Sequence, residues 1–423
     1  MKQVNLLTDS PRRLFFHYLG PTIGSSMVTS IYILADTIMV GQGVGDAGLA
    51  ALTIFMPIVA SFFALGLLLG VGGGVLMSVA KGSGNESLAH KYFSTAMISA
   101  AVVSVCFAVF GAIFFDPMMY ALGADTTNIE LVRGYGLCYT ISAPLFIFSS
   151  SLQSFIRNDK SPRHAMIAVL TGSGLNILLD YLFIFVFKMG MFGASFATSI
   201  GTSITVCILV IHFFTKKNTM RFSFRFFSIK ALWEIAKCGF SSFLIECANA
   251  VLVFVFNHTL LKYIGSVGVT VYSIMSNVAV VCMSLFNGVT LAAQPIIATN
   301  HGADNHKRVL QVRHIGTITS SVIAVIIFCV GFFFPDLLIY SYVKGPTPEI
   351  LELARYALRI YFFAYLFMNF NILFSGYFQS TLRPVAAITI QILRSLLLSS
   401  VLVSVLPMIF GADAIWYAVP ITE

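Results

Sequence analysis

The stretch GLAALTIFMPIVASFFALGLLLGVGGGVLMSVAKGSGN, residues 48–85, has a second version later in the same chain. That version is GVTVYSIMSNVAVVCMSLFNGVTLAAQPIIATNHGADN, residues 268–305, and the two align without a gap at a spacing of 220 residues. The alignment superposes Gly48, Gly82 and Asn85 on Gly268, Gly302 and Asn305. Self-similarity at a fixed spacing indicates a duplicated structural unit. We therefore predict two homologous halves of about six membrane spans each.

The composition indicates that these halves lie in a membrane. Of 423 residues, 58% are hydrophobic and only 10% are charged, and the mean hydropathy is +0.90. Soluble domains carry roughly 25% charged residues, so this chain has too few to cover a water-facing surface. A membrane helix needs about 20 apolar residues. On that criterion we expect spans at 14–41, 47–79, 92–115, 132–156, 163–187, 191–214, 236–263, 267–299, 312–334, 353–380 and 384–409.

The distribution of basic residues predicts the orientation of these spans. Eighteen of the 25 Lys and Arg residues fall on the side of the N-terminus and six on the other side. Cytoplasmic loops are enriched in Lys and Arg, so we place the N-terminus in the cytoplasm. Both halves then begin inside, and the two repeats are parallel, related by an axis along the membrane normal.

The same pattern divides the chain into lobes. We expect an N-terminal lobe at 1–215, a basic cytoplasmic linker at 216–235 and a C-terminal lobe at 236–423. The basic and aromatic residues around the linker favour a segment at the lipid headgroups, and no nucleic-acid motif accompanies the net charge of +8. The last segment, FGADAIWYAVPITE, matches only the opening of the span at 191–214. We therefore expect eleven complete spans and the beginning of a truncated twelfth.

Three acidic residues, Asp36, Asp180 and Glu246, fall well inside predicted spans. Carboxylates in the membrane are rare and usually functional, although a static polar contact between helices is the alternative. Asp36 and Asp180 both lie late in outward-running spans. Asn176 is one helical turn before Asp180, on the same face. Thr198, early in the next span, reaches a similar depth.

This set of oxygens suits a small cation. Hard cations such as Na⁺ take carboxylate, carbonyl and hydroxyl ligands, and two neighbouring carboxylates can equally hold a proton. The site could therefore load and unload a coupling ion. Pro21, in the same span as Asp36, removes a helix hydrogen bond; it indicates either a bend coupled to ion occupancy or a static kink.

Enzyme chemistry has no visible basis in the sequence. The glycine-rich run at 66–84 lacks the Gly-Lys-Ser/Thr ending of a phosphate-binding loop. There is no HExxH metal motif, no GxSxG nucleophile motif and no paired-cysteine spacing. We predict a transport protein that has no cofactor besides its coupling ion.

The motifs LADTIMVGQGVGDAGLAAL, GLNILLDYLFIF, FGASFATSIGT and GVTLAAQPIIATNHGA, taken together, resemble the multidrug and toxic compound extrusion (MATE) family, in particular its bacterial DinF-like and MepA-like branch. The resemblance covers essentially the whole chain. It implies an all-α integral membrane protein with two pseudo-symmetric six-helix lobes around a cleft, in a bacterial cytoplasmic membrane. It also implies a multidrug efflux antiporter, coupled to Na⁺ or H⁺, that exports organic, often cationic, compounds.

The resemblance assigns roles to residues of this chain. The N-lobe cation site would comprise Asp36, Asn176, Asp180 and Thr198, with the Ala194 carbonyl as a further ligand, and Pro21 would be the bending proline. Relatives with a second site pair an acid in the span at 236–263 with one in the span at 353–380. Glu246 fits the first position, but the second span offers only Asn369 and Asn371.

The resemblance also implies that the substrate binds in the cleft between the lobes. We expect aromatic and amide side chains to line it for binding organic cations, with Phe55, Tyr139, Tyr361, Gln153 and Gln294 as candidates. The alternative function is a flippase of lipid-linked oligosaccharides from the same superfamily. Such a flippase would need cationic residues in the cleft, where only Arg394 lies well inside a span. A monomer would suffice for either function.

Overall fold

The computed structural model describes residues 4–342 and 345–423, and leaves Lys2 and Lys344 of the charge pattern outside. In the described part, ten helices are long and apolar enough to cross a membrane, and a helix pair bent by 52° (α5 and α6) brings the number to eleven. The first half contains α1 (Pro11–Gly43), α2 (Asp46–Gly82), α3 (Glu86–Ile113), α4 (Phe115–Ala121), α5 (Ile129–Ile141), α6 (Ala143–Asn158), α7 (Pro162–Asp180), η1 (Tyr181–Val186), α8 (Gly190–Ile211), η2 (His212–Phe214) and η3 (Phe224–Phe226). The second half contains α9 (Ile229–Tyr263), α10 (Ser266–Gly302), α11 (His306–Phe333), α12 (Pro335–Tyr342), α13 (Pro348–Ser380), α14 (Pro384–Gln391), η4 (Ile392–Leu398), α15 (Ser399–Phe410), η5 (Ala412–Tyr417) and α16 (Ala418–Thr422).

The stretches that align in the sequence form matching helices in the two halves. α2 and α10 are both 37 residues long, and α3 and α11 are both 28 residues long. The glycines before α2 and α10, Gly45 and Gly265, have φ values of 85° and 84°, which favour glycine. The Asn85 and Asn305 side chains each accept a hydrogen bond from a backbone N–H of the helix that follows. Local sequence thus starts and ends these helices in the same way in both halves.

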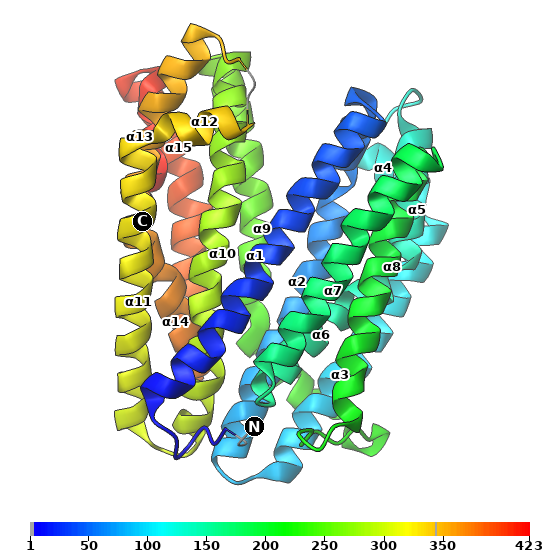
Figure 1. The fold of residues 1–423 in the computed structure, drawn as a ribbon, viewed down its shortest axis with the longest axis vertical. Helices are drawn as coiled ribbons and strands as arrows, with labels where there is room; N and C mark the ends of the chain where they lie inside the picture. Colours follow the sequence, from blue (N-terminus) through cyan, green and yellow to red (C-terminus); the bar gives the residue numbers. More distant parts are fainter. Residues whose placement is uncertain (1–3, 343–344) are drawn as a thin grey trace.

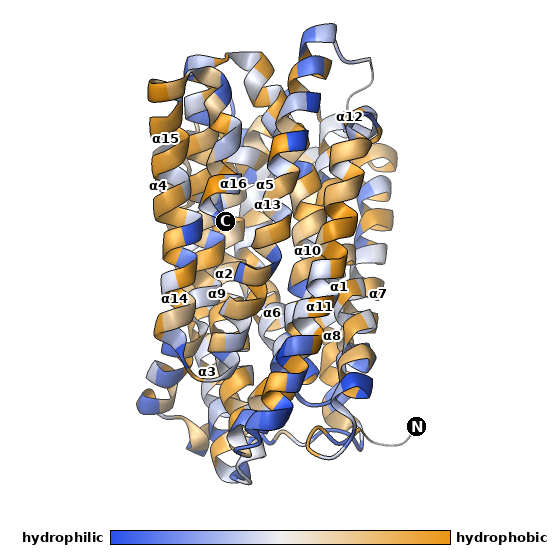
Figure 2. Ribbon diagram, turned by 90° about the vertical axis from the view of Figure 1, so that its left-hand side faces the viewer, coloured by the Kyte–Doolittle hydropathy of each residue, from blue (hydrophilic) through white to orange (hydrophobic). Residues whose placement is uncertain are grey.

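The outer surface is apolar, as a lipid-facing surface must be. Large hydrophobic side chains such as Phe110, Ile113 and Phe254 are exposed. Hydrophilic residues gather toward the two ends of the molecule, and hydrophobic residues predominate between them (Figure 2). Each half also has its own hydrophobic core, one built around α2, α3 and α6 and the other around α10, α11 and α13.

We call α1–α8 the N-lobe and α9–α16 the C-lobe. The first helix of each lobe packs against the other lobe. α1 contacts α10 as well as α7, and α9 contacts α2. In Figure 1, α1 runs obliquely from the foot of the C-lobe to the far end of the N-lobe. The Thr22 hydroxyl fixes this crossing by donating a hydrogen bond of 2.7 Å to the Gly288 carbonyl on α10. α9 begins at Ile229 and so takes up the last part of the linker predicted at 216–235.

The lobes meet at the end that carries the N-terminus and diverge toward the other end (Figure 1). Glycines allow the backbones to touch at this junction. A Cβ on Gly239 would lie 2.0 Å from the Leu68 carbonyl oxygen, and one on Gly72 would lie 2.3 Å from that of Ile235. No larger residue fits without moving the lobes apart. At the end of the chain, where the sequence predicts the beginning of a twelfth span, the structure shows the short helices η5 and α16.

Candidate functional site

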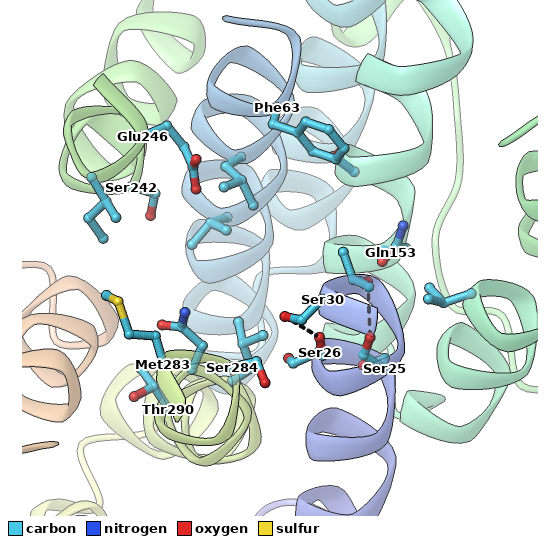
Figure 3. Close-up of a pocket in the computed structure, with 18 of the residues that line it drawn as sticks. Ser25, Ser26, Ser30, Phe63, Gln153, Ser242, Glu246, Met283, Ser284 and Thr290 are labelled. Atoms are coloured by element: carbon cyan, nitrogen blue, oxygen red, sulfur yellow. Dashed lines mark hydrogen bonds between the residues drawn. The ribbon is translucent and has the colours of Figure 1, made fainter. Parts of the chain in front are cut away.

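A cavity of about 480 Å³ lies between the lobes. Its walls come from α1, α2, α6, α7 and α8 on one side and from α9, α10, α13, α14 and η4 on the other. Glu246 and Ser242 of the C-lobe face it from one side, and Gln153 and Ser30 of the N-lobe from the other (Figure 3). Small polar side chains dominate the lining, among them Ser25, Ser26, Ser30, Ser242, Ser284 and Thr290. The Ser and Thr residues inside the apolar spans are the feature of the sequence from which this lining could have been predicted.

Among the described residues that line the cavity, three have acidic or basic side chains, Arg157, Glu246 and Arg394. Arg394 is paired with Glu423, its Nε lying 2.5 Å from Oε2 of that residue. Arg157 corrects our sequence analysis, which ended the span at residue 156 and placed only Arg394 among the cationic residues inside spans. Arg157 lies inside α6, is 7% exposed and lines the cavity. Its position one residue before the end of the helix hid it from a hydropathy window.

The predicted carboxylates do come together. Asp36 on α1 and Asp180 at the end of α7 are buried, and the two helices pack on each other. The two carboxylates lie within electrostatic range of one another. One oxygen of Asp36 and both oxygens of Asp180 are buried without a hydrogen-bond partner. The first turn after Asp180 is π-helical, a distortion that is frequent at functional sites.

Asn176 and Thr198 complete this oxygen cluster. The Asn176 Nδ2 donates to the Thr198 hydroxyl at 3.2 Å, and that hydroxyl donates to the Ala194 carbonyl at 3.0 Å. Because the Thr198 proton is used by Ala194, the hydroxyl oxygen can only accept from Asn176. The amide is therefore oriented with its carbonyl oxygen free, and that oxygen is buried and unpartnered.

Two glycines hold the helices that carry this cluster at close range. A Cβ on Gly172 of α7 would lie 2.6 Å from the Gly201 carbonyl oxygen, and one on Gly201 of α8 would lie 2.8 Å from the Gly172 carbonyl oxygen. Close approach of α7 and α8 is what brings Asn176 within hydrogen-bond distance of Thr198. Larger residues at these positions would move the Asn176 and Thr198 side chains apart.

The oxygen cluster adjoins the cavity rather than lying within it. Asn176 and Thr198 line the cavity, as does Tyr32, which lies one turn before Asp36. The hydroxyls of Tyr32, Tyr135 and Tyr139 all lie within electrostatic range of Asp36. Sequence reasoning missed Tyr32 and Tyr135, although the spacing of Tyr32 and Asp36 by four residues puts them on one helix face.

The candidate cleft residues divide into two groups. Gln153 and Gln294 line the cavity, as expected. Phe55 and Tyr139 lie instead in the N-lobe core, where their ring centroids are 5.6 Å apart in an edge-to-face arrangement. Tyr361 packs against the C-lobe core beside Tyr365. The structure does not bring these three aromatic rings to the cavity wall, because the faces of α2, α5 and α13 that carry them point into the lobes.

The second acidic position is isolated. Glu246 lines the cavity, and no ion pair or hydrogen bond to its carboxylate is present in the described residues. On α13, the Asn369 side-chain oxygen accepts a hydrogen bond of 3.1 Å from the Ser320 hydroxyl, and the Asn371 amide donates one of 2.8 Å to the Glu423 carboxylate. The two asparagines are thus engaged elsewhere in the C-lobe. Across the described residues, no group of three or more His, Cys, Asp or Glu side chains could hold a metal.

The MatE family model matches residues 21–182 and 238–405, one range in each half. The chain belongs to the MATE family. As a MATE transporter it is a multi-pass membrane protein and not an enzyme.

Relatives extend over nearly the whole chain. The multidrug export protein MepA of Staphylococcus haemolyticus is 25% identical over 413 residues, covering 97% of this chain and 90% of the relative. MepA of Staphylococcus saprophyticus is 26% identical over 411 residues, covering 96% and 90%.

Solved structures show the same fold. An outward-facing multidrug resistance MATE transporter superimposes with a TM-score of 0.94 at 22% identity, covering 100% of this chain and 94% of the other. A MOP superfamily transporter from Pyrococcus furiosus, described as having a binding pocket of reverse polarity, gives 0.92 at 22% identity, with the same coverage. The fold predicted from the sequence, an all-α membrane protein of the MATE type, is confirmed.

Proposed function

We infer that this MATE transporter is a multidrug exporter of the MepA kind, driven by entry of Na⁺ or H⁺ and working by alternating access. The observation that carries the inference is the cluster of buried, unpartnered oxygens on Asp36, Asn176 and Asp180. Buried acceptors without donors are unfavourable unless a cation or proton fills the space between them. With Thr198 and Ala194, they provide the donor atoms that Na⁺ prefers.

The position of the cluster supports coupling. Asn176 and Thr198 belong both to the cluster and to the cavity wall, so occupancy by an ion and occupancy by a solute affect the same side chains. Ion loading would pull α1 and α7 together through Asp36 and Asp180. Because α1 also packs on α10, that movement would reach the C-lobe. Pro21, inside the crossing segment of α1, is the proposed bending point.

The orientation of the molecule follows from its charges. The N-terminus, the linker and the loops with most of the basic residues lie at the end where the lobes meet. We place that end in the cytoplasm of a bacterial cell. The conformation would then be closed to the cytoplasm. We propose that the substrates are small organic compounds and that the exporter works as a monomer.

Reconstitution tests this proposal. The chain is placed in liposomes, Na⁺ and H⁺ gradients are imposed separately, and a fluorescent organic cation is followed. One gradient should drive export, and Asp36→Asn and Asp180→Asn should each abolish it. Asp125→Asn, in an exposed loop, is the matched control and should export normally. Export that survives both site substitutions would make the carboxylates structural and leave Glu246 as the coupling candidate.

The flippase alternative keeps one supporting observation, the two guanidinium groups at the cavity, of which that of Arg394 is already paired. If neither gradient moves the dye, translocation of a lipid-linked oligosaccharide becomes the next measurement.

A further inference from the structure

Arg157 is a buried cation that has no anionic partner in the part of the chain that the structure describes. The hydrogen bond of its side chain is a long one, 3.4 Å from Nη2 to the Ser154 hydroxyl, and its Nε has no partner at all. The residue is 7% exposed, and what remains accessible belongs to the cavity wall. An unpaired guanidinium in such a place is unfavourable by several kcal/mol, which an anion beside it would offset.

The nearest carboxylate along the chain cannot neutralise Arg157. Both oxygens of Asp159 are taken: Lys81 lies 2.5 Å from Oδ1, where the Thr219 hydroxyl also donates, and His212 lies 2.9 Å from Oδ2. The Tyr18 hydroxyl is within electrostatic range of Arg157 but is itself buried and unpartnered. The other cavity guanidinium, Arg394, has Glu423. Among the described residues that line the cavity, Arg157 is therefore the cation left for a ligand.

The surroundings of Arg157 suit an acidic group. Gln153, one turn earlier on α6, also lines the cavity, and its amide is held by a 3.1 Å hydrogen bond to Ser149. A guanidinium presents a planar fork of donors that matches the two oxygens of a carboxylate. Glu246 faces the cavity from the opposite wall (Figure 3), and within the described residues its carboxyl group has no cationic partner. The two lobes thus present a guanidinium group and a carboxyl group to one cavity.

We propose that Arg157 forms an anion subsite of the export cavity, which binds the carboxylate of a zwitterionic organic solute while Glu246 faces its cationic end. This rests on the proposed export function and assigns to Arg157 the recognition of one part of the solute. Cationic solutes bind without using Arg157, and zwitterions bind more tightly because the buried guanidinium gains its missing partner.

A matched dye pair tests the subsite. Rhodamine B is a zwitterion, and its ethyl ester has the same fluorophore without the carboxylate. Binding of each dye to the full chain in nanodiscs of neutral lipid is measured by fluorescence anisotropy. Arg157→Gln should weaken binding of rhodamine B roughly tenfold or more and leave that of the ester unchanged. Arg157→Lys, which keeps the charge without the fork, should be intermediate, and Asp125→Asn, in an exposed loop away from the cavity, is the control.

Thermal stability provides a second readout that needs no solute. Because Arg157 is unpaired, Arg157→Gln should raise the Tm of the empty protein, whereas removal of a structural arginine would lower it. A lower Tm, or equal weakening of both dyes, would overturn the inference. The inference would also be overturned if added anionic lipid bound at Arg157 while the affinity for rhodamine B stayed the same in Arg157→Gln. The subsite would then belong to a lipid headgroup.

The two proposals fail separately. If the protein exports the ester but Arg157→Gln does not change the affinity for rhodamine B, the export function stands and the anion subsite is ruled out. Absence of gradient-driven export of either dye, with the binding difference present, would remove the export function and keep the subsite.

Discussion

A Cβ on Gly82 would lie 2.0 Å from the carbonyl oxygen of Thr299, which belongs to the other lobe. The relationship is reciprocal, because a Cβ on Gly302 would lie 2.0 Å from the Val79 carbonyl oxygen. Gly82 and Gly302 are counterparts in the internal repeat, so the junction between the lobes is built twice from one motif. The backbones of the two lobes can approach this closely because neither Gly82 nor Gly302 has a Cβ atom.

Gly82→Ala and Gly302→Ala should therefore open this junction. Overpacking of this kind destabilises by about 1–3 kcal/mol, enough to shift a two-state population about tenfold. We expect faster hydrogen exchange at 78–84 and 298–304 and reduced export. Gly174→Ala is the control, since a Cβ there meets nothing within 4 Å. Unchanged exchange in both junction variants would show that the lobes adjust around a methyl group.

Thr198 is expected to orient Asn176 for cation binding. Thr198→Val removes the acceptor of the 3.2 Å hydrogen bond and leaves the Asn176 amide free to rotate. The half-saturating concentration of the coupling ion should rise about tenfold, as for loss of one buried hydrogen bond. Thr198→Ser keeps the hydroxyl and should behave as wild type. Transport assays over a series of ion concentrations decide, and a valine variant with wild-type ion dependence would contradict the assignment.

Asp159 should make stability depend on acid pH. Burial disfavours its ionised form, but hydrogen bonds and charge from His212, Lys81 and Thr219 outweigh burial and hold the pKa of Asp159 below its usual value. A lowered pKa means that the carboxylate stabilises the fold above the ordinary value of 3.8 and that this contribution is lost as the pH falls through the lower native value. The Tm in detergent should therefore drop below about pH 4.

Asp159→Asn separates this effect from general acid denaturation. Loss of one partner of a buried pair destabilises by about 3–5 kcal/mol, so the variant should melt earlier at neutral pH and show a flatter Tm below pH 4. Asp125→Asn, in an exposed loop, should change the neutral Tm far less. A variant that follows the wild-type pH curve would show that other carboxylates control acid stability.

Pro21 should matter for movement more than for stability. Proline deprives the His17 carbonyl of its helical hydrogen bond within α1, and Pro21→Ala restores the donor. We expect a higher Tm, slower hydrogen exchange at 17–24 and slower export, because α1 bends less readily. Normal export rates in a stabilised variant would mean that the kink is static.

Much of this molecule could be predicted from the sequence, because the relevant signals are local or repeated. Membrane insertion follows from composition. The two halves follow from the alignment of 48–85 with 268–305. The approach of Asn176 to Thr198 follows from their depth in adjoining spans, and the same reasoning brings Asp36 toward Asp180.

Only the tertiary structure decided which faces of the helices meet the cavity. Phe55 and Tyr139 turned out to lie in the N-lobe core, whereas Tyr32 and Arg157 line the cavity or adjoin the carboxylates. In a soluble protein the apolar face of a helix identifies its buried side. In a membrane, the lipid-facing and the core-facing sides are both apolar, so periodicity cannot separate them. The crossings of α1 and α9, which set the cavity between the lobes, depend on contacts between residues far apart in the sequence, such as Thr22 with Gly288 and Leu68 with Gly239.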